Sequence, residues 1–90
     1  MRELFVGTRT GLGEDGAVHH FDYSVVIGEM EVGGRFSCES YGVKISEQGG
    51  DTAVIPNITV SISRIDALME QLVGGLVSPA SVRDVVDDWL

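Results

Sequence analysis

The 90-residue sequence predicts an α+β domain, in which an antiparallel meander of about four strands precedes two C-terminal helices packed on one face of the sheet. Two observations carry this prediction. Residues 17–30 alternate between apolar and polar side chains, which is the period of a strand buried on one face. The last thirty residues instead space their apolar side chains at helical intervals. Because the length suits one domain, we assign 1–90 to a single unit, with strands in about 3–60 and helices in 62–90.

The first two strands are predicted at residues 3–8 and 17–30, separated by a glycine-rich polar loop over 9–16. In the second strand, one face carries large apolar and aromatic side chains. They are Phe21, Tyr23, Val25 and Ile27. This face is the expected core side of the sheet.

A third strand is predicted at residues 35–46, after a turn at 31–34, but its apolar side chains change parity partway along. Phe36 and Cys38 share one side, whereas three later residues share the other. Those later residues are Tyr41, Val43 and Ile45. A β-bulge near Ser40 or Gly42 would put all five on one face, so a bulge is expected there.

The fourth strand is predicted at residues 52–55, after a turn at 48–51. Pro56 has no backbone N–H, so it ends this strand or confines it to a sheet edge. Ile58 and Val60 are candidates to continue the extended run after the break.

Two helices follow, each with its own start signal. Ser63 and Asp66 resemble a capping box before the first apolar stripe, and Gly74-Gly75 is a left-handed stop. Ser78-Pro79 offers an N-cap and a first helical residue for the second helix. The apolar stripe of that helix comprises Val82, Val85, Val86, Trp89 and Leu90. Its outer side is acidic, with Asp84, Asp87 and Asp88.

Charge and composition exclude several classes of function. The net charge of −8, from 14 acidic and 6 basic residues, disfavours nucleic acid and anionic membranes, both of which need a basic surface. A lone cysteine gives no disulfide framework, and no apolar run is long enough for a signal peptide or a membrane span. We therefore expect a cytoplasmic protein. An apolar content of 43% is rich for so small a chain, which favours self-association.

Three motifs with potential chemistry lack the context that the chemistry needs. Gly11, Gly13 and Gly16 match phosphate-cradling spacings, but a strand follows them and Glu14-Asp15 would repel phosphate. Adjacent His19 and His20 point to opposite faces of a strand, which leaves only His20 with Asp22 as a two-ligand surface metal site.

Cys38 would need a base such as His20 to act as a nucleophile, and a free cysteine beside Phe36 is more typical of a small core residue. The aspartates at 84, 87 and 88 are typical of a solvated helix face, although such spacing also suits a cation or a basic partner. We therefore assign no catalytic, cofactor-binding or metal-binding residue, and we expect no cofactor.

Several segments together resemble a family of short bacterial proteins of unknown function, found in anaerobic, gut-dwelling Gram-positive bacteria. The segments that carry the resemblance are Tyr41–Ile45, Ile58, Ile65–Leu72, Val77–Pro79 and Asp84–Leu90. The resemblance implies a shared scaffold and a cytosolic bacterial setting. The family has no assigned activity, so it supplies no functional residues.

The sequence favours a non-enzymatic protein that acts through protein–protein contacts, with a second copy of itself as the expected partner. The candidate interface is the last helix, through Val82, Val86, Trp89 and Leu90. The alternative is a small-ligand-binding domain, with a pocket between sheet and helices lined by Phe21, Tyr23 and Tyr41. A third hypothesis, an acidic decoy of nucleic acid, requires carboxylates gathered on one surface.

Overall fold

The structure is a computed structural model that describes residues 2–12, 15–34 and 36–90. Four strands come first and two helices follow. The elements are β1 (Arg2–Leu12), β2 (Val18–Val32), β3 (Phe36–Glu47), β4 (Thr52–Thr59), α1 (Ile62–Gly74) and α2 (Val82–Trp89). The sheet order is β1-β2-β3-β4 and each neighbouring pair is antiparallel, which confirms the predicted meander.

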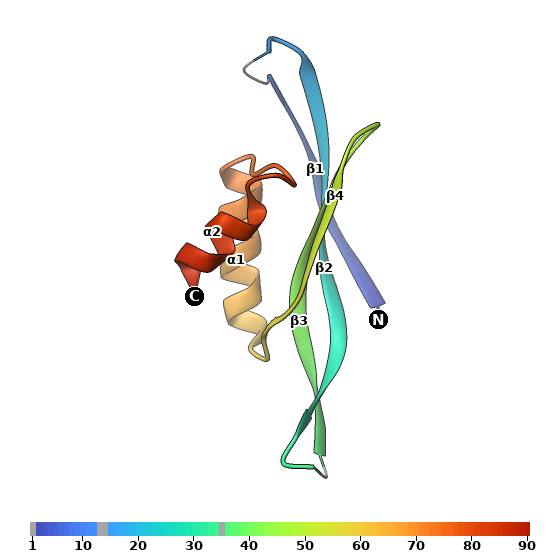
Figure 1. Cartoon of the computed structure of the whole chain (residues 1–90), viewed down its shortest axis with the longest axis vertical. Coiled ribbons are helices and arrows are strands. Elements are labelled where there is room, and N and C mark those ends of the chain that lie inside the picture. The colour runs from blue at the N-terminus through green and yellow to red at the C-terminus, as the bar shows by residue number, and fades with distance from the viewer. Residues whose placement is uncertain (1, 13–14, 35) are drawn as a thin grey trace.

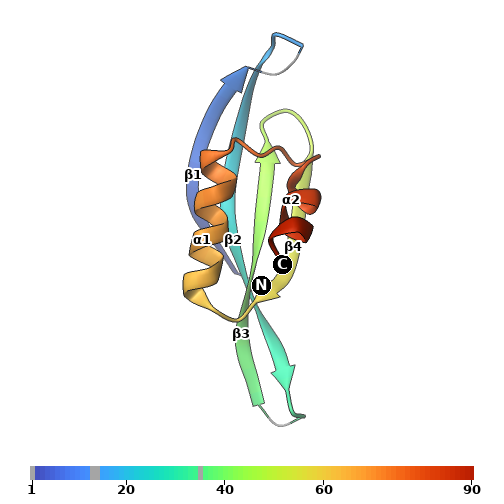
Figure 2. The same cartoon turned by 90° about the vertical axis from the view of Figure 1, so that its left-hand side faces the viewer.

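Both helices cover the same face of the sheet, as predicted (Figure 1; Figure 2). The strands are longer than the helices, so paired β1 and β2 extend beyond the helices at one end and paired β2 and β3 at the other (Figure 1). The molecule is accordingly elongated, with extents of 51 × 23 × 17 Å.

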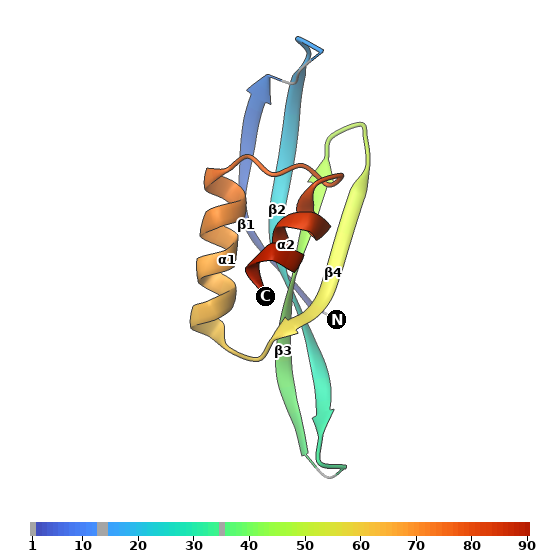
Figure 3. The ribbon, with the colours of Figure 1, turned by 60° about the vertical axis from the view of Figure 1, so that its left-hand side comes forward.

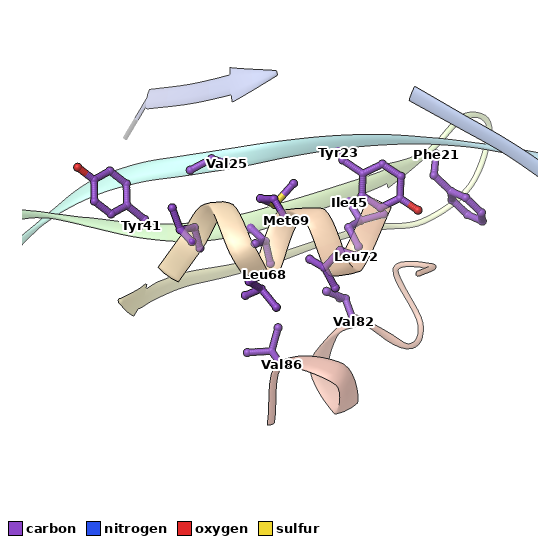
Figure 4. Close-up of a cluster of buried hydrophobic side chains, with 12 residues drawn as sticks. Phe21, Tyr23, Val25, Tyr41, Ile45, Leu68, Met69, Leu72, Val82 and Val86 are labelled. Carbon is purple, nitrogen blue, oxygen red and sulfur yellow. The ribbon is translucent and has the colours of Figure 1, made fainter. Parts of the chain in front are cut away.

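The core lies between the helices and the central strands (Figure 4). From the sheet it takes the predicted apolar face of β2 and, from β3, Tyr41, Val43 and Ile45. From α1 and α2 it takes the inward stripes. The buried members are Phe21, Tyr23, Val25, Tyr41, Val43, Ile45, Ile65, Leu68, Met69, Leu72, Val82 and Val86. Each buried aliphatic side chain stabilises the fold by about 1.5–3 kcal/mol, which makes this layer the main source of stability.

The opposite face of the sheet carries pairs of polar side chains that link neighbouring strands or, across β2, the flanking strands β1 and β3. Thr8 donates to Asp22 across β1 and β2, and Lys44 forms an ion pair with Glu3. A sheet with one packed and one solvated face is typical of antiparallel meanders.

The predicted bulge in β3 is wrong. Pairing of β3 with β2 is continuous from Phe36 to Glu47, so Phe36 and Cys38 lie on the other face from Tyr41. Phe36 is accordingly 74% exposed. The apolar residues of β3 do change from even to odd positions, but the strand continues past this change without an extra residue.

The irregularity lies in β4 instead. Tyr41 pairs with Thr59 and Val43 pairs with Ile55, so β4 carries extra residues between these pairs. Asn57 there is left-handed, with φ of 56°. The bulge lets Ile58 pack on the core although it breaks the alternation set by Ile55. β4 is an edge strand, which confirms the position predicted from its proline.

Element ends differ from the sequence predictions at the end of β1, at both ends of α1 and at the start of α2. β1 continues to Leu12, so most of the predicted 9–16 loop is strand. The cap of α1 is Ser61, whose hydroxyl accepts from the Arg64 N–H, and the predicted capping box from Ser63 does not form. Ser61 has the extended backbone that an N-cap needs, so the helix begins earlier in the chain.

The end of α1 uses a different left-handed residue from the one predicted. Gly75 has φ of −87°, and Leu76 takes φ of 51°. A left-handed leucine costs roughly 1–2 kcal/mol, which its packing against the core offsets. α2 begins at Val82 rather than directly after Ser78, and the Ser78 carbonyl accepts from the Val82 N–H at 3.1 Å.

A substitution at Gly42 of β3 tests the close approach of the β4 bulge, because the β4 backbone passes directly beside this glycine. A Cβ at Gly42 would lie 2.2 Å from the Ile55 carbonyl oxygen and 2.6 Å from Pro56 Cα. Both are backbone atoms, so we expect Gly42→Ala to lower the free energy of unfolding by about 1–3 kcal/mol in urea denaturation. Gly7→Ala in β1 is the matched control, since a Cβ there meets nothing within 4 Å. Equal effects of the two substitutions would contradict the close crossing.

Candidate functional site

A pocket opens at the end of the sheet where the helix connection meets the β1–β2 hairpin. It has a volume of about 460 Å³. Its walls come from the ends of β1, β2 and β3, from the β3–β4 turn and from the segment between α1 and α2. Its lining residues include Gly11, His19, Phe21, Glu47, Asp51, Leu76 and Ser78. We call this the end-of-sheet pocket.

The alternation of β2 sends His19 and Phe21 to the pocket side of the sheet, and their rings stack with centroids 6.1 Å apart. Because Phe21 pairs with Glu47 across β2 and β3, the Glu47 side chain reaches the His19 ring from the end of β3. Leu76 closes another wall and packs so tightly on Gly11 that a Cβ there would overlap its side chain. The pocket is therefore built by strand register and by the turn after α1.

His19 contacts a carboxylate with each ring nitrogen. Nδ1 bonds to Glu47, and Nε2 lies 3.3 Å from Asp15 Oδ1. The hydrogen bond to Glu47, followed by that to Asp15, raises the pKa of His19 above its ordinary 6.5. The Ala17 N–H, followed by His19, lowers the pKa of Asp15 below its ordinary 3.8. Both shifts favour the charged forms.

The chemistry of the end-of-sheet pocket is acidic and partly apolar. No lysine or arginine is among its described lining residues, and the charge of His19 is already matched by Glu47 and Asp15, so phosphate and other anions find no free counter-charge there. Among the residues that the structure describes, no group of three or more His, Cys, Asp or Glu side chains has an arrangement that would hold a metal ion. The pocket thus suits neutral or cationic groups.

A family model covers residues 2–90 of the chain and carries the description of a family of unknown function, DUF6514. The chain belongs to this family. No curated protein and no solved structure matches it. Membership in DUF6514 supplies a shared scaffold, and the site must be argued from this chain alone.

For this DUF6514 member, the structure separates the three residues of the predicted ligand pocket. Tyr23 is fully buried, and its ring fills the interface between the sheet and the helices. Phe21 lines the end-of-sheet pocket, and Tyr41 lines a different cleft of about 270 Å³ at the far end of α1. The interface between sheet and helices is packed, and the open space lies at its ends.

The predicted interface on the last helix divides in the same way. Val82 and Val86 are in the chain's own core, so they present no surface to a partner. Trp89 is partly buried and stacks under Arg64 of α1, with the guanidinium carbon 4.5 Å from the ring centroid. Leu90 alone of the four is well exposed, at 69%.

The remaining sequence candidates are dispersed. His20 bonds Thr10 on the outer face, opposite His19, as strand alternation predicts. Cys38 pairs with Met30, ten residues along β2 from His20 and about 33 Å away by strand rise, so this histidine is no base for it. Of the glycine motif, Gly11 is in β1, while Gly13 and Glu14 lie outside the described residues.

The acidic side chains at 84, 87 and 88 are all exposed on α2. The other described acidic residues are spread over the strands, turns and α1, so the carboxylates do not gather on one surface as an acidic decoy requires. No helix in the described part of the chain has the length and apolarity needed to cross a membrane.

Sequence reasoning missed the link between Asp15, His19 and Glu47. His19 and Phe21 share a face by alternation, which was visible in the sequence. The pairing of Phe21 with Glu47 depends on strand register, which alternation alone does not set.

Tyr23 offers a test of how the helix connection is held. Its hydroxyl donates to the Val77 carbonyl oxygen at 2.8 Å, and this contact is part-buried although Tyr23 itself is fully buried. We expect Tyr23→Phe to lower the free energy of unfolding by about 1–2 kcal/mol in urea denaturation, because the carbonyl loses its partner. Tyr41→Phe is the control: its hydroxyl bonds the half-exposed Glu39 carboxylate, where water replaces it, so the loss is smaller. A larger loss in the control would contradict this account.

Proposed function

We propose that this protein is a small non-enzymatic module that works through protein–protein contacts and self-associates by pairing β1 with β1 of a second copy. We place it in the cytoplasm of anaerobic gut Gram-positive bacteria, as the resemblance of its sequence motifs implies. The free cysteine Cys38 accords with a reducing compartment.

The observation that carries the proposal is the open edge of β1. This strand is at the end of the sheet order, and no described strand pairs with its outer side. Three consecutive large apolar side chains on it are well exposed: Leu4 at 59%, Phe5 at 62% and Val6 at 47%. A long edge strand with exposed apolar residues is a template for pairing with another chain.

The other edge of the sheet lacks these properties. β4 carries Pro56, which removes one donor, and the bulge with left-handed Asn57 distorts the strand beside it. Proline and bulges are the devices that block strand addition. β1 has an irregularity of its own between Phe5 and Gly7, where its register with β2 shifts, but it carries no proline. The edge of β4 is the more obstructed of the two, so β1 is the better suited to a partner.

The space beside β1 also suits a second copy. An open groove of about 530 Å³ lies between β1 and α1, lined by Val6, Met69 and Val73, with Asp66 and Glu70 beside them. An added β1 brings apolar Leu4 and Val6 together with two arginines, Arg2 and Arg9. Its apolar residues match the groove. The two arginines are already engaged within their own chain, Arg2 with Glu39 and Arg9 with the Val73 carbonyl oxygen, so they lower the negative charge of this edge rather than pair with the partner. A two-fold axis would make the contact identical for both copies.

Self-association is measured by sedimentation equilibrium over micromolar concentrations. We expect a dimer for the wild-type chain and at least about a tenfold weaker Kd for Val6→Lys, because lysine on an edge strand opposes pairing. Leu90→Lys, at a more exposed apolar position that follows α2 (69% against 47% for Val6), is expected to leave Kd unchanged.

Two outcomes would contradict the proposal. A wild-type mass that stays at 9.6 kDa across the range excludes self-association. A dimer that Leu90→Lys disrupts and Val6→Lys does not would place the interface at the end of α2.

The end-of-sheet pocket favours a second candidate function, the binding of a small neutral or cationic molecule. Its volume of about 460 Å³ falls within the range of ligand sites, and it combines polar His19 and Glu47 with apolar Phe21. A fragment screen by NMR tests it. A binder is expected to shift the amide signals of His19 and Ala80, and Ala80→Trp is expected to abolish the shift by filling the pocket. Shifts that persist in that variant would exclude this pocket as the site.

A further inference from the structure

The turn after β1 and the end of β3 are joined through one side chain. His19 lies on β2 between two carboxylates, with Nδ1 bonded to Glu47 at the end of β3 and Nε2 at 3.3 Å from Asp15 in the β1–β2 turn. The ring is part-buried, with its side chain 30% exposed, and the Phe21 ring holds it from one side. Its position is therefore set by packing as well as by hydrogen bonds.

The arrangement requires a particular protonation state of His19. An ionised carboxylate only accepts hydrogen bonds, and a neutral imidazole has a single N–H to donate. Both contacts are hydrogen bonds only when both ring nitrogens carry a proton. Loss of one proton turns a nitrogen lone pair toward a carboxylate oxygen, which breaks one contact and repels it.

We propose that the imidazolium of His19 is a pH-sensitive clasp that fixes Asp15 of the β1–β2 turn to the end of β3, beside the end-of-sheet pocket. The proposal is independent of self-association, since every group involved belongs to one copy.

The clasp acts where the backbone alone provides little support. Beyond the pairing of Phe21 with Glu47, one backbone hydrogen bond, from the Gln48 N–H to the His20 carbonyl oxygen at 2.9 Å, joins β2 to the chain after β3. From there the β1–β2 hairpin extends past the rest of the sheet (Figure 3). A two-stranded hairpin is marginally stable by itself. Asp15 Oδ1 also accepts from the Ala17 N–H at 3.0 Å, so the carboxylate that holds His19 also shapes the turn. Release of His19 therefore loosens the turn.

Other charged groups around His19 reinforce its positive charge. Asp51 of the β3–β4 turn lines the same pocket, whereas the described lining residues from β1 and from the α1–α2 connection carry no charge. Arg9 of β1 is engaged with the Val73 carbonyl oxygen at 3.0 Å, and His20 bonds Thr10 on the opposite face. Carboxylates thus dominate the field on His19 from the described part of the chain.

The direction of the pH dependence follows from the two shifts. The pKa of His19 is raised by its carboxylate partners, so its contribution to stability is full below about 6.5 and is lost as pH rises through its folded value. The pKa of Asp15 is lowered by the Ala17 N–H and by His19, so its contribution is full above about 3.8 and is lost as pH falls through its folded value. The clasp is closed between these limits and opens on the alkaline side of the His19 titration.

NMR of the His19 ring and of the Ala17 amide tests the clasp in the full chain. In the wild-type protein, the protection of the Ala17 amide against hydrogen exchange, corrected for intrinsic rate, is expected to fall as His19 loses its proton. Glu47→Gln keeps the shape but removes one charge, so the His19 midpoint is expected to fall and Ala17 protection to be lost at lower pH. His19→Phe keeps the stacking on Phe21 and is expected to remove the change in Ala17 protection over the pH range in which His19 titrates in the wild-type protein.

Asp22→Asn is the matched control, because Asp22 is a carboxylate of the same hairpin that bonds Thr8 on the outer face. It is expected to leave both readouts as in the wild-type protein. Ala17 protection that stays constant through the His19 titration would overturn the proposal. So would a His19 midpoint that Glu47→Gln does not lower.

Discussion

Tyr23 anchors the connection between the two helices to the centre of the sheet, and the arrangement of the C-terminal third depends on it. Its buried hydroxyl holds the Val77 carbonyl oxygen at 2.8 Å. α2 has only eight residues, fewer than the roughly 12–15 that an isolated helix needs, so it is stable because Val82 and Val86 are docked in the core. The same connection supplies one wall of the end-of-sheet pocket. One hydrogen bond in the sheet–helix interface therefore influences both the packing of α2 and the shape of the pocket.

Most of the fold could be predicted from periodicity, because burial of one face of a strand or helix produces a regular spacing of apolar residues in the sequence. The alternation through Phe21 and Tyr23 identified β2, and helical spacing identified α1 and α2. The bulge was assigned to the wrong strand because a parity change in β3 does not reveal where its neighbour has extra residues. The left-handed Leu76 was unpredictable for a related reason: its strain is offset by contacts distant in sequence. Such features depend on the partner of a segment, and one sequence does not specify that partner.

The candidate site could not be predicted for the same reason, because it depends on contacts between segments that are distant in sequence. His19 and Glu47 are 28 residues apart and meet only through the register of β2 and β3. The residues that the sequence predicted for a pocket or an interface, such as Tyr23 and Val82, are apolar, and they lie in the core because they are apolar. In a chain with so little interior, the large apolar residues of central strands and helices are needed for folding. The functional surface is therefore to be sought among edge strands, turns and polar residues.

Charge places a further constraint on any contact between copies. Two chains that each carry −8 repel one another, and this repulsion is screened over about 10 Å at 0.1 M salt. Most basic residues of the described chain already serve internal contacts: Arg2 with Glu39, Lys44 with Glu3, and Arg64 with Trp89. β1 is unusual in carrying two arginines against one glutamate. Pairing along β1 would bring together two edges of low net charge, whereas contact through the aspartate-rich outer side of α2 would bring together two strongly negative surfaces.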